Sequence, residues 1–174
     1  MLVFLDTEFT SFDEPRLISA GLVAEDEYRW IYTELDGEHW YKHASEFVLQ
    51  EVVPLLDRRY GWEQPAAAAA RIRKWCEKLP EMSAIVCDSD YDWDLFRGLM
   101  LEHGSWPDVL VDQPVPVQWS PRMHEFRQDY LLRYGLSAHN ARADAKALRF
   151  AFLAQRELPP EPTFGAADFP KEAL

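Results

Sequence analysis

Two acidic residues stand close together at the end of the first apolar segment of the chain. Residues 2–5 read Leu-Val-Phe-Leu, typical of a buried strand, and Asp6 and Glu8 follow two positions apart. Side chains at i and i+2 of a strand point to the same face, so these carboxylates would lie side by side. Two close anions repel, and a hard divalent cation with oxygen ligands relieves that repulsion. The pair is a candidate metal site; the alternative is a strand that turns polar where it reaches the surface.

A second acidic group follows the apolar segment 83–87. Asp92 lies at the predicted start of a helix over residues 93–103, and a helix N-terminus favours an anion. Asp88, Asp90 and Asp94 compete with Asp92 for any ligand role. All four could equally be helix caps or surface charges.

A histidine and an aspartate open the last long helix. His139 lies in a predicted loop, and Asp144 lies in the first turns of a helix predicted over residues 142–155. Alanine, leucine and phenylalanine recur along that helix at helical spacing, so one side of it should pack against the core. Taken singly, His139 could be a surface residue and Asp144 a helix-start charge.

The elements that must position these residues follow from the hydrophobic pattern. Three strands joined by short polar turns predict an antiparallel meander at the N-terminus, with the first strand and its exit over 2–10 and the others over 16–24 and 28–35. Residues 38–61 are irregular, and a helix then begins at Pro65 and continues to about Leu79. A short strand over 83–87, a last apolar segment over 109–111 and a helix starting at Ser120-Pro121 and ending before Gly135 complete the pattern.

Strands followed by alternating helices and strands predict an α/β fold. We expect a mixed central sheet, with the antiparallel meander joined to parallel strands, flanked by helices. No internal repeat or domain boundary is visible. Residues 1–157 are expected to form a single domain and residues 158–174 an irregular, proline-rich tail.

The composition narrows the function. The chain has 174 residues, 48% of them hydrophobic, and a net charge of −12. Such an acidic chain does not suit a nonspecific binder of duplex nucleic acid. Its two cysteines form no disulfide framework or zinc pattern, which favours a cytoplasmic protein. We find no signal peptide and no apolar run long enough to span a membrane.

Three motifs together are far more specific than any one of them. The segments FLDTEFT (4–10), CDSDYDWDLF (87–96) and HNARADAKAL (139–148), in this order and spacing, resemble the DEDDh branch of the DnaQ-like 3′–5′ exonuclease superfamily. The resemblance covers nearly the whole chain except the tail and implies a ribonuclease H-like fold. The second motif departs from its relatives, which often read His-Asn-x-x-Phe-Asp, and this leaves Asp88 and Asp90 as secondary ligand candidates.

The resemblance implies roles for individual residues. Asp6, Glu8, Asp92 and Asp144 would be the ligands of two Mg²⁺ ions, for which Mn²⁺ can substitute, and His139 would be the general base. The sister branch has a tyrosine four residues before the last aspartate, where this chain has Asn140. The predicted substrate-binding residues are Thr7, Phe9, Thr10 and Asn140. Phe9 could stack on a base or belong to the core.

The expected activity is that of a metal-dependent 3′–5′ exoribonuclease, releasing nucleoside 5′-monophosphates from single-stranded 3′ ends. The chain resembles small free-standing relatives of the ribonuclease T and oligoribonuclease type, and also a small bacterial exoribonuclease group whose first motif similarly reads Asp-Thr-Glu-Phe. Such relatives are commonly homodimers, so the resemblance implies a homodimer as well. One alternative is a single-stranded DNA exonuclease or a proofreading-type subunit. A binding module without turnover and a metal-stabilised scaffold are alternatives from other classes. Arg122, Arg127, Arg142, Lys146 and Arg149 could contact phosphates, although each alone would more simply be a surface residue.

Overall fold

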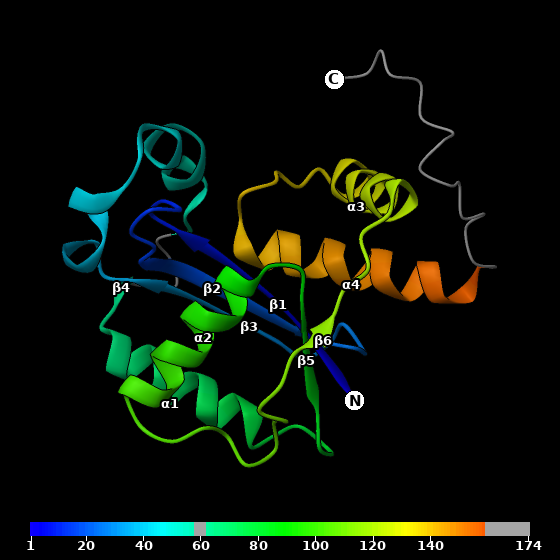
Figure 1. Cartoon of the computed structure of the whole chain (residues 1–174), viewed down its shortest axis with the longest axis horizontal. Coiled ribbons are helices and arrows are strands. Elements are labelled where there is room, and N and C mark those ends of the chain that lie inside the picture. The colour runs from blue at the N-terminus through cyan, green and yellow to red at the C-terminus, as the bar shows by residue number, and fades with distance from the viewer. Residues whose placement is uncertain (58–61, 159–174) are drawn as a thin grey trace.

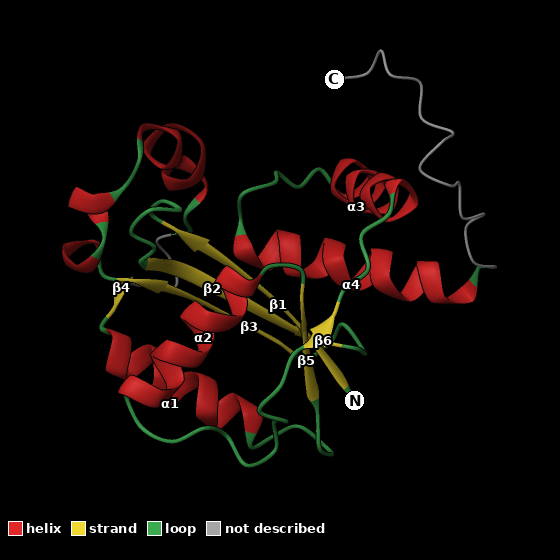
Figure 2. Ribbon diagram, in the orientation of Figure 1, coloured by secondary structure: helices red, strands yellow, loops and turns green. Residues whose placement is uncertain are grey.

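A six-stranded mixed sheet forms the centre of the molecule, with helices on both faces (Figures 1 and 2). The structure is a computed structural model that describes residues 1–57 and 62–158. The predicted tail, apart from Leu158, lies outside the described residues. None of the helices in the described ranges is long and apolar enough to cross a membrane.

The N-terminal meander is confirmed. Strands β1 (Leu2–Phe9), β2 (Leu17–Ala24) and β3 (Trp30–Leu35) pair antiparallel in succession. Strand β5 (Ala84–Cys87) then pairs parallel with β1 on its other side. The sheet order is β4-β3-β2-β1-β5-β6, so β1 lies in the interior of the sheet with a neighbour on each edge.

Two short edge strands complete the sheet and differ from the sequence prediction. Strand β6 is Val115–Pro116, beyond the predicted apolar segment 109–111, whose Leu110 makes only an isolated bridge to Ser83. Strand β4 is Trp62–Glu63 and was not predicted. Two-residue edge strands carry too little periodicity to be recognised from a sequence.

The helices form two layers. Helices α1 (Pro65–Cys76) and α2 (Asp90–Glu102) cover one face, and α3 (Pro121–Tyr134) and α4 (Ala141–Glu157) lie on the other (Figure 1). Val3 and Leu5 belong to the larger core beneath α1 and α2, whereas Phe4 packs with Met123 and Leu148 of α3 and α4. The alternation of β1 therefore places its odd residues toward α2 and its even residues, Asp6 and Glu8 included, toward α4.

Helix α2 begins earlier than predicted. It starts at Asp90, and Ser89 caps it by accepting a hydrogen bond from the Tyr91 N–H at 3.1 Å. Asp92 therefore lies inside the first turn. The N-cap Ser89 comes only two residues after Cys87, where β5 ends. Hydrophobic periodicity cannot resolve a strand end and a helix start that lie this close together. The start of α3 after Ser120 and its end at Gly135, which has a φ of 61°, are as predicted.

A glycine brings α4 against the sheet next to Asp6. Gly21 of β2 is the register partner of Asp6, and a Cβ at Gly21 would lie 2.4 Å from the backbone oxygen of Ala141, the first residue of α4. Only a residue without a side chain allows this approach. The absence of a side chain at Gly21 thus determines how close α4, and with it Asp144, lies to β1.

We expect Gly21→Ala to destabilise the protein by about 1–3 kcal/mol, because the methyl group must push the backbone of α4 away. Urea unfolding measures the effect. Gly98→Ala is the matched control: Gly98 lies within α2 with nothing within 4 Å of a Cβ, so it should be neutral or stabilising. Equal unfolding midpoints for Gly21→Ala and the parent would contradict the close approach.

Candidate active site

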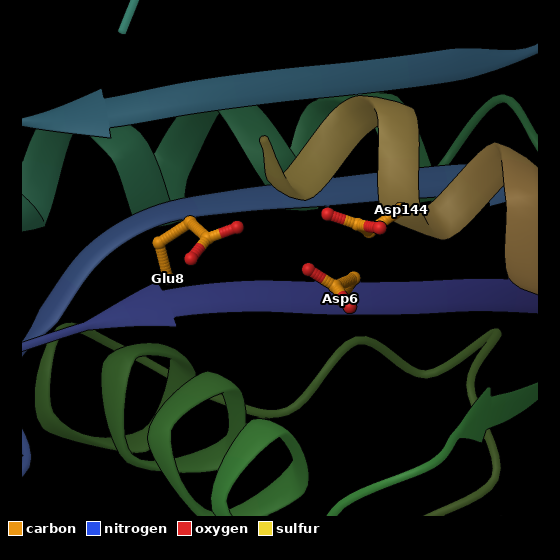
Figure 3. A group of neighbouring side chains, drawn as sticks. All are labelled: Asp6, Glu8 and Asp144. Atoms are coloured by element: carbon orange, nitrogen blue, oxygen red, sulfur yellow. The ribbon is translucent and has the colours of Figure 1, made fainter. Parts of the chain in front are cut away.

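Three predicted residues meet above the end of β1. Asp6 and Glu8 point from β1 toward Asp144 on α4 (Figure 3). One carboxylate oxygen of each lies within 4.8 Å of the others, and all three side chains are buried. The strand alternation and the close approach at Gly21 together produce this arrangement. The geometry therefore favours the interpretation of Asp6 and Glu8 as a metal site over their interpretation as the polar end of a strand at the surface.

A second group of carboxylates shares Asp6. Asp6, Asp88 and Asp92 also offer oxygens within 4.8 Å of one another. Asp92 comes from α2 on the opposite layer, and Thr7 fixes it: the Thr7 backbone N–H and hydroxyl both donate to Asp92 Oδ1, at 3.0 and 2.6 Å. Asp6 is thus common to two overlapping sets of oxygen ligands, as a pair of neighbouring cations requires.

Asp90 and Asp94 are not part of either group. Asp90 and Asp94 are exposed on α2, and neither belongs to the two carboxylate clusters found among residues 1–57 and 62–158. Of the four acidic residues that competed in the sequence, the structure brings only Asp92 and Asp88 to the site. On α2, Asp92 reaches the site and Asp90 and Asp94 do not, because Asp92 lies on the inward side of the first helical turn.

Burial and mutual repulsion make these carboxylates unusually basic. Burial, and then the charges of Asp92 and Asp144, raise the pKa of Asp6 well above its usual range. Burial and the charges of Asp144 and Asp92 raise the pKa of Glu8 to about 8. Burial also raises the pKa of Asp92 to about 7, opposed by the hydrogen bond from Thr7. Without a cation, these carboxyl groups therefore retain protons more readily than exposed ones do. A bound cation would displace those protons.

We expect the metal-free protein to lose stability as the pH rises. Because the pKa values of Glu8 and Asp92 are raised on folding, their stabilising contribution is complete below about pH 4 and disappears as the pH passes about 7–8. The melting temperature in a chelator should therefore fall by about 5–10 °C between pH 5 and pH 8.5. Added Mg²⁺ should largely abolish the decrease. Scanning calorimetry measures both, and a metal-independent melting temperature at pH 8.5 would contradict the repulsion.

His139 lines the same cavity as the carboxylates. The cavity has a volume of about 830 Å³, and its lining includes Asp6, Glu8, Asp92, His139 and Asp144. The imidazole packs edge-on against Phe47, with ring centroids 5.0 Å apart. The His139 backbone has a φ of 65°, a left-handed conformation uncommon for residues other than glycine. Backbone strain of this kind clusters at functional sites.

The predicted substrate-binding residues have different surroundings. Phe9 lines the cavity, where its ring stacks on Tyr91 at 5.4 Å and meets Phe12 edge-on. Thr7 also lines it but holds Asp92. Thr10 is fully buried, and its hydroxyl donates to the Glu14 carbonyl at 2.7 Å. Its partners lie in the turn after β1, outside the cavity lining.

Asn140 acts on the structure around α4. Its side-chain oxygen accepts a hydrogen bond from the Ala143 N–H at 3.2 Å, which caps the helix, and its amide donates to the Leu55 carbonyl at 3.1 Å. The Asn140 backbone N–H donates to Asp144 Oδ2 at 3.2 Å. Asn140 therefore orients Asp144, and its side chain faces the segment 53–57 instead of the carboxylates.

The interpretation of Arg127 as a surface residue is wrong. Its guanidinium pairs with Asp88 and, at 3.2 Å, with Asp144 Oδ1, and it lines the cavity. The sequence carried one signal for this placement: Met123, Arg127 and Tyr130 share the inward side of α3 at helical spacing. Arg122 and Arg127 lie on the same helix, and only Arg127 lies on the side that faces the site.

Comparisons with known proteins confirm the fold. No protein-family model and no curated protein sequence matches the chain. Among solved structures, S. pombe Pop2p in its Mg²⁺- and Mn²⁺-bound form matches with a TM-score of 0.55 and 16% identity, over 90% of this chain and 82% of that one.

Two other solved structures share the fold. The structure of a 3′-exonuclease that specifically recognises the 3′ end of a histone mRNA stem-loop matches with a TM-score of 0.55 and 9% identity, over 88% of this chain. E. coli exonuclease I in a zinc-bound complex with single-stranded DNA matches with a TM-score of 0.51 and 17% identity, over 90% of this chain. The chain spans 62% of the first of these and 40% of the second. These likenesses concern the fold alone, and they confirm the predicted ribonuclease H-like fold.

Proposed function

We propose that this protein is a metal-dependent 3′–5′ exonuclease of the DEDDh branch of the DnaQ-like superfamily. It releases nucleoside 5′-monophosphates from single-stranded 3′ ends, preferably of RNA, and residues 1–157 form its exonuclease domain. One observation carries the proposal: two groups of buried carboxylates share Asp6 in a single cavity that His139 also lines. This is the arrangement that the sequence motifs predict, on the fold that such enzymes share.

The donor set suits Mg²⁺ or Mn²⁺. Asp6, Glu8 and Asp144 would hold one ion, and Asp6 and Asp92, with Asp88, the other. All donors are carboxylate oxygens, the ligands these ions prefer. A structure of similar fold, Pop2p, contains both metals. When bound, a pair of such ions stabilises charge on a phosphodiester and makes a water more acidic.

The remaining residues of the cavity have separate tasks. His139 accepts the proton of the attacking water, since a neutral imidazole is a suitable base near neutral pH. Phe9 offers an aromatic wall for the terminal base. Thr7 and Asn140 hold Asp92 and Asp144 in place. The site thus separates ion binding, proton transfer and base stacking among different side chains.

RNA is the preferred substrate in this proposal because the first motif resembles that of small exoribonucleases. A single-stranded DNA exonuclease is the alternative, and one protein of similar fold was solved with single-stranded DNA. The catalytic residues are compatible with both substrates.

A digestion experiment tests the function. Labelled RNA and DNA oligonucleotides of equal length and sequence, carrying the label at the 5′ end, are incubated with Mg²⁺, with Mn²⁺ or with a chelator, and the products are separated by size. We expect a ladder shortened from the 3′ end, faster for RNA, and no products in the chelator. Oligonucleotides with blocked 3′ ends are the control and should stay intact. Intact RNA and DNA in both metals would exclude the function.

A further inference from the structure

A buried arginine joins the two carboxylate groups. One terminal nitrogen of Arg127 pairs with Asp88, and the other donates to Asp144 Oδ1 at 3.2 Å. Asp88 belongs to the group with Asp92, and Asp144 to the group with Glu8. Only 17% of the Arg127 side chain is exposed. One cation therefore contacts one candidate ligand of each ion.

The surroundings of Arg127 fix its position. Trp119 lies over the guanidinium at 5.2 Å, an attractive cation–π arrangement. Burial alone would lower the pKa of Arg127, but the charges of Asp88, Asp6 and Asp144 raise it. The side chain is held in the cavity as a permanent positive charge.

Arg127 balances the formal charge of the site when both ions are bound. The two groups contain five different carboxylates, whereas two divalent ions carry only four positive charges. Without Arg127 the loaded site would keep one negative charge and repel a phosphodiester. With Arg127 it is neutral. The additional carboxylate, Asp88, and the arginine therefore form a matched pair.

The guanidinium also has unused donors. Arginine offers five N–H groups in a planar fork that matches a phosphate. Within the part of the chain that the structure describes, Arg127 uses donors only toward Asp88 and Asp144. A cation that replaced the arginine at Asp144 would free a further donor beside the reacting phosphate.

We propose that Arg127 binds a phosphate of the substrate and that, before the ions bind, its guanidinium competes with them for Asp88 and Asp144. The proposal rests on the function proposed above. Its two parts predict opposite effects of one substitution. Removing the guanidinium should strengthen metal binding and weaken substrate binding, whereas a merely structural arginine would weaken both when removed.

Calorimetric titration with Mn²⁺ alone tests the competition. We expect Arg127→Gln to lower the Kd for Mn²⁺ by about three- to tenfold, because a neighbouring positive charge is lost. Arg127→Lys keeps the charge and should bind Mn²⁺ with about the parent Kd. Arg133→Gln, on the exposed side of the same helix, controls for net charge and should not change the Kd. An unchanged or higher Kd in Arg127→Gln would overturn the competition.

Substrate affinity tests the phosphate contact. At saturating Mn²⁺, Arg127→Gln should raise the KM for a ten-residue oligoadenylate, and the Kd for adenosine 5′-monophosphate, by about ten- to one-hundredfold. Arg127→Lys should raise both by a smaller factor, since an ammonium cannot reproduce the planar fork. A change confined to kcat, with KM and the nucleotide Kd within twofold of the parent, would overturn the contact.

The two proposals fail in different ways. If the parent protein leaves the oligonucleotide intact in Mn²⁺, the exonuclease function is wrong, and the Mn²⁺ and nucleotide titrations still decide the role of Arg127. If the parent digests the oligonucleotide and the Arg127 variants match it in both affinities, only the inference about Arg127 is wrong. If Arg127→Gln does not fold, Arg127→Met replaces it in the Mn²⁺ titration, because methionine also removes the charge and can still pack against Trp119. Arg127→Lys then tests the phosphate contact through its KM and nucleotide Kd.

Discussion

Asp6→Asn should reduce the rate of oligonucleotide hydrolysis by at least about a thousandfold, since it weakens two ion sites worth several kcal/mol of transition-state stabilisation. Asp6 is the carboxylate common to both groups, and asparagine keeps its shape without its charge. No other single substitution removes a ligand from both groups. Initial rates with a labelled oligonucleotide in Mg²⁺ measure the loss.

The same substitution should not weaken the metal-free fold. The pKa of Asp6 is raised by burial and by its acidic neighbours, so its ionised form opposes folding above the usual carboxyl pKa. At pH 8 in a chelator, Asp6→Asn should therefore melt at or above the temperature of the parent. Added Mg²⁺ should raise the melting temperature of the parent and leave that of the variant nearly unchanged. The loss of activity and the gain of apo stability together distinguish a ligand from a structural residue.

Asp94→Asn is the matched control for this experiment. Asp94 is exposed on α2, one helical position beyond Trp93, and belongs to neither carboxylate group. Its substitution removes the same charge from the protein, so activity and the Mg²⁺ effect should stay at the parent level. Parent-level hydrolysis by Asp6→Asn would remove Asp6 from the ion sites and the proposed mechanism with it.

The sequence could predict the acidic pair because strand geometry is local. Alternation along β1 places Asp6 and Glu8 on one face whatever the rest of the chain does. Convergence with Asp92 and Asp144 was not a local property and came from the resemblance of the motifs. The structure shows its physical basis, in which Gly21 lets α4 approach β1 and Thr7 holds Asp92.

Arg127 and Asp88 show where the sequence stops being informative. An arginine on an amphipathic helix is usually a surface residue. The spacing from Met123 and Tyr130 indicates the inward side of α3, but only the structure shows that Arg127 contacts Asp88 and Asp144 there. Asp88 follows a strand and precedes a cap, where acidic residues are common for local reasons. Each residue compensates the charge of the other, so neither can be interpreted without the contact between them.

The substrate contacts predicted for Thr10 and Asn140 stay predictions, and the structure shows a second task for each side chain. Both lie beside motif residues, which suggested substrate contacts, yet both side chains make local hydrogen bonds. Asn140 stands three residues before Ala143 at the start of a helix, the usual spacing of an N-cap, and this signal was present in the sequence. Capping chemistry explains the residue more directly than proximity to a motif does.

His139→Gly should slow hydrolysis by about a hundred- to ten-thousandfold, the range expected for loss of a general base. Glycine is the informative replacement because it accepts the φ of 65° at this position without strain, so the fold and the approach to α4 are preserved. His139 belongs to neither carboxylate group, so the Kd for Mn²⁺ should not change. Single-turnover rates and Mn²⁺ titration measure the two quantities separately.

The space left by the imidazole allows a second test of the same role. Because the His139 side chain lines the cavity, added imidazole can enter the position it vacates in His139→Gly. If His139 accepts a proton, imidazole should restore part of the lost rate, and more of it as the pH rises and the neutral form predominates. His124→Ala, which removes an exposed histidine of α3, is the control and should neither lose activity nor respond to imidazole. A parent-level rate in His139→Gly would exclude His139 as the base, whereas a lost rate that imidazole leaves unchanged would point to positioning through its contact with Phe47.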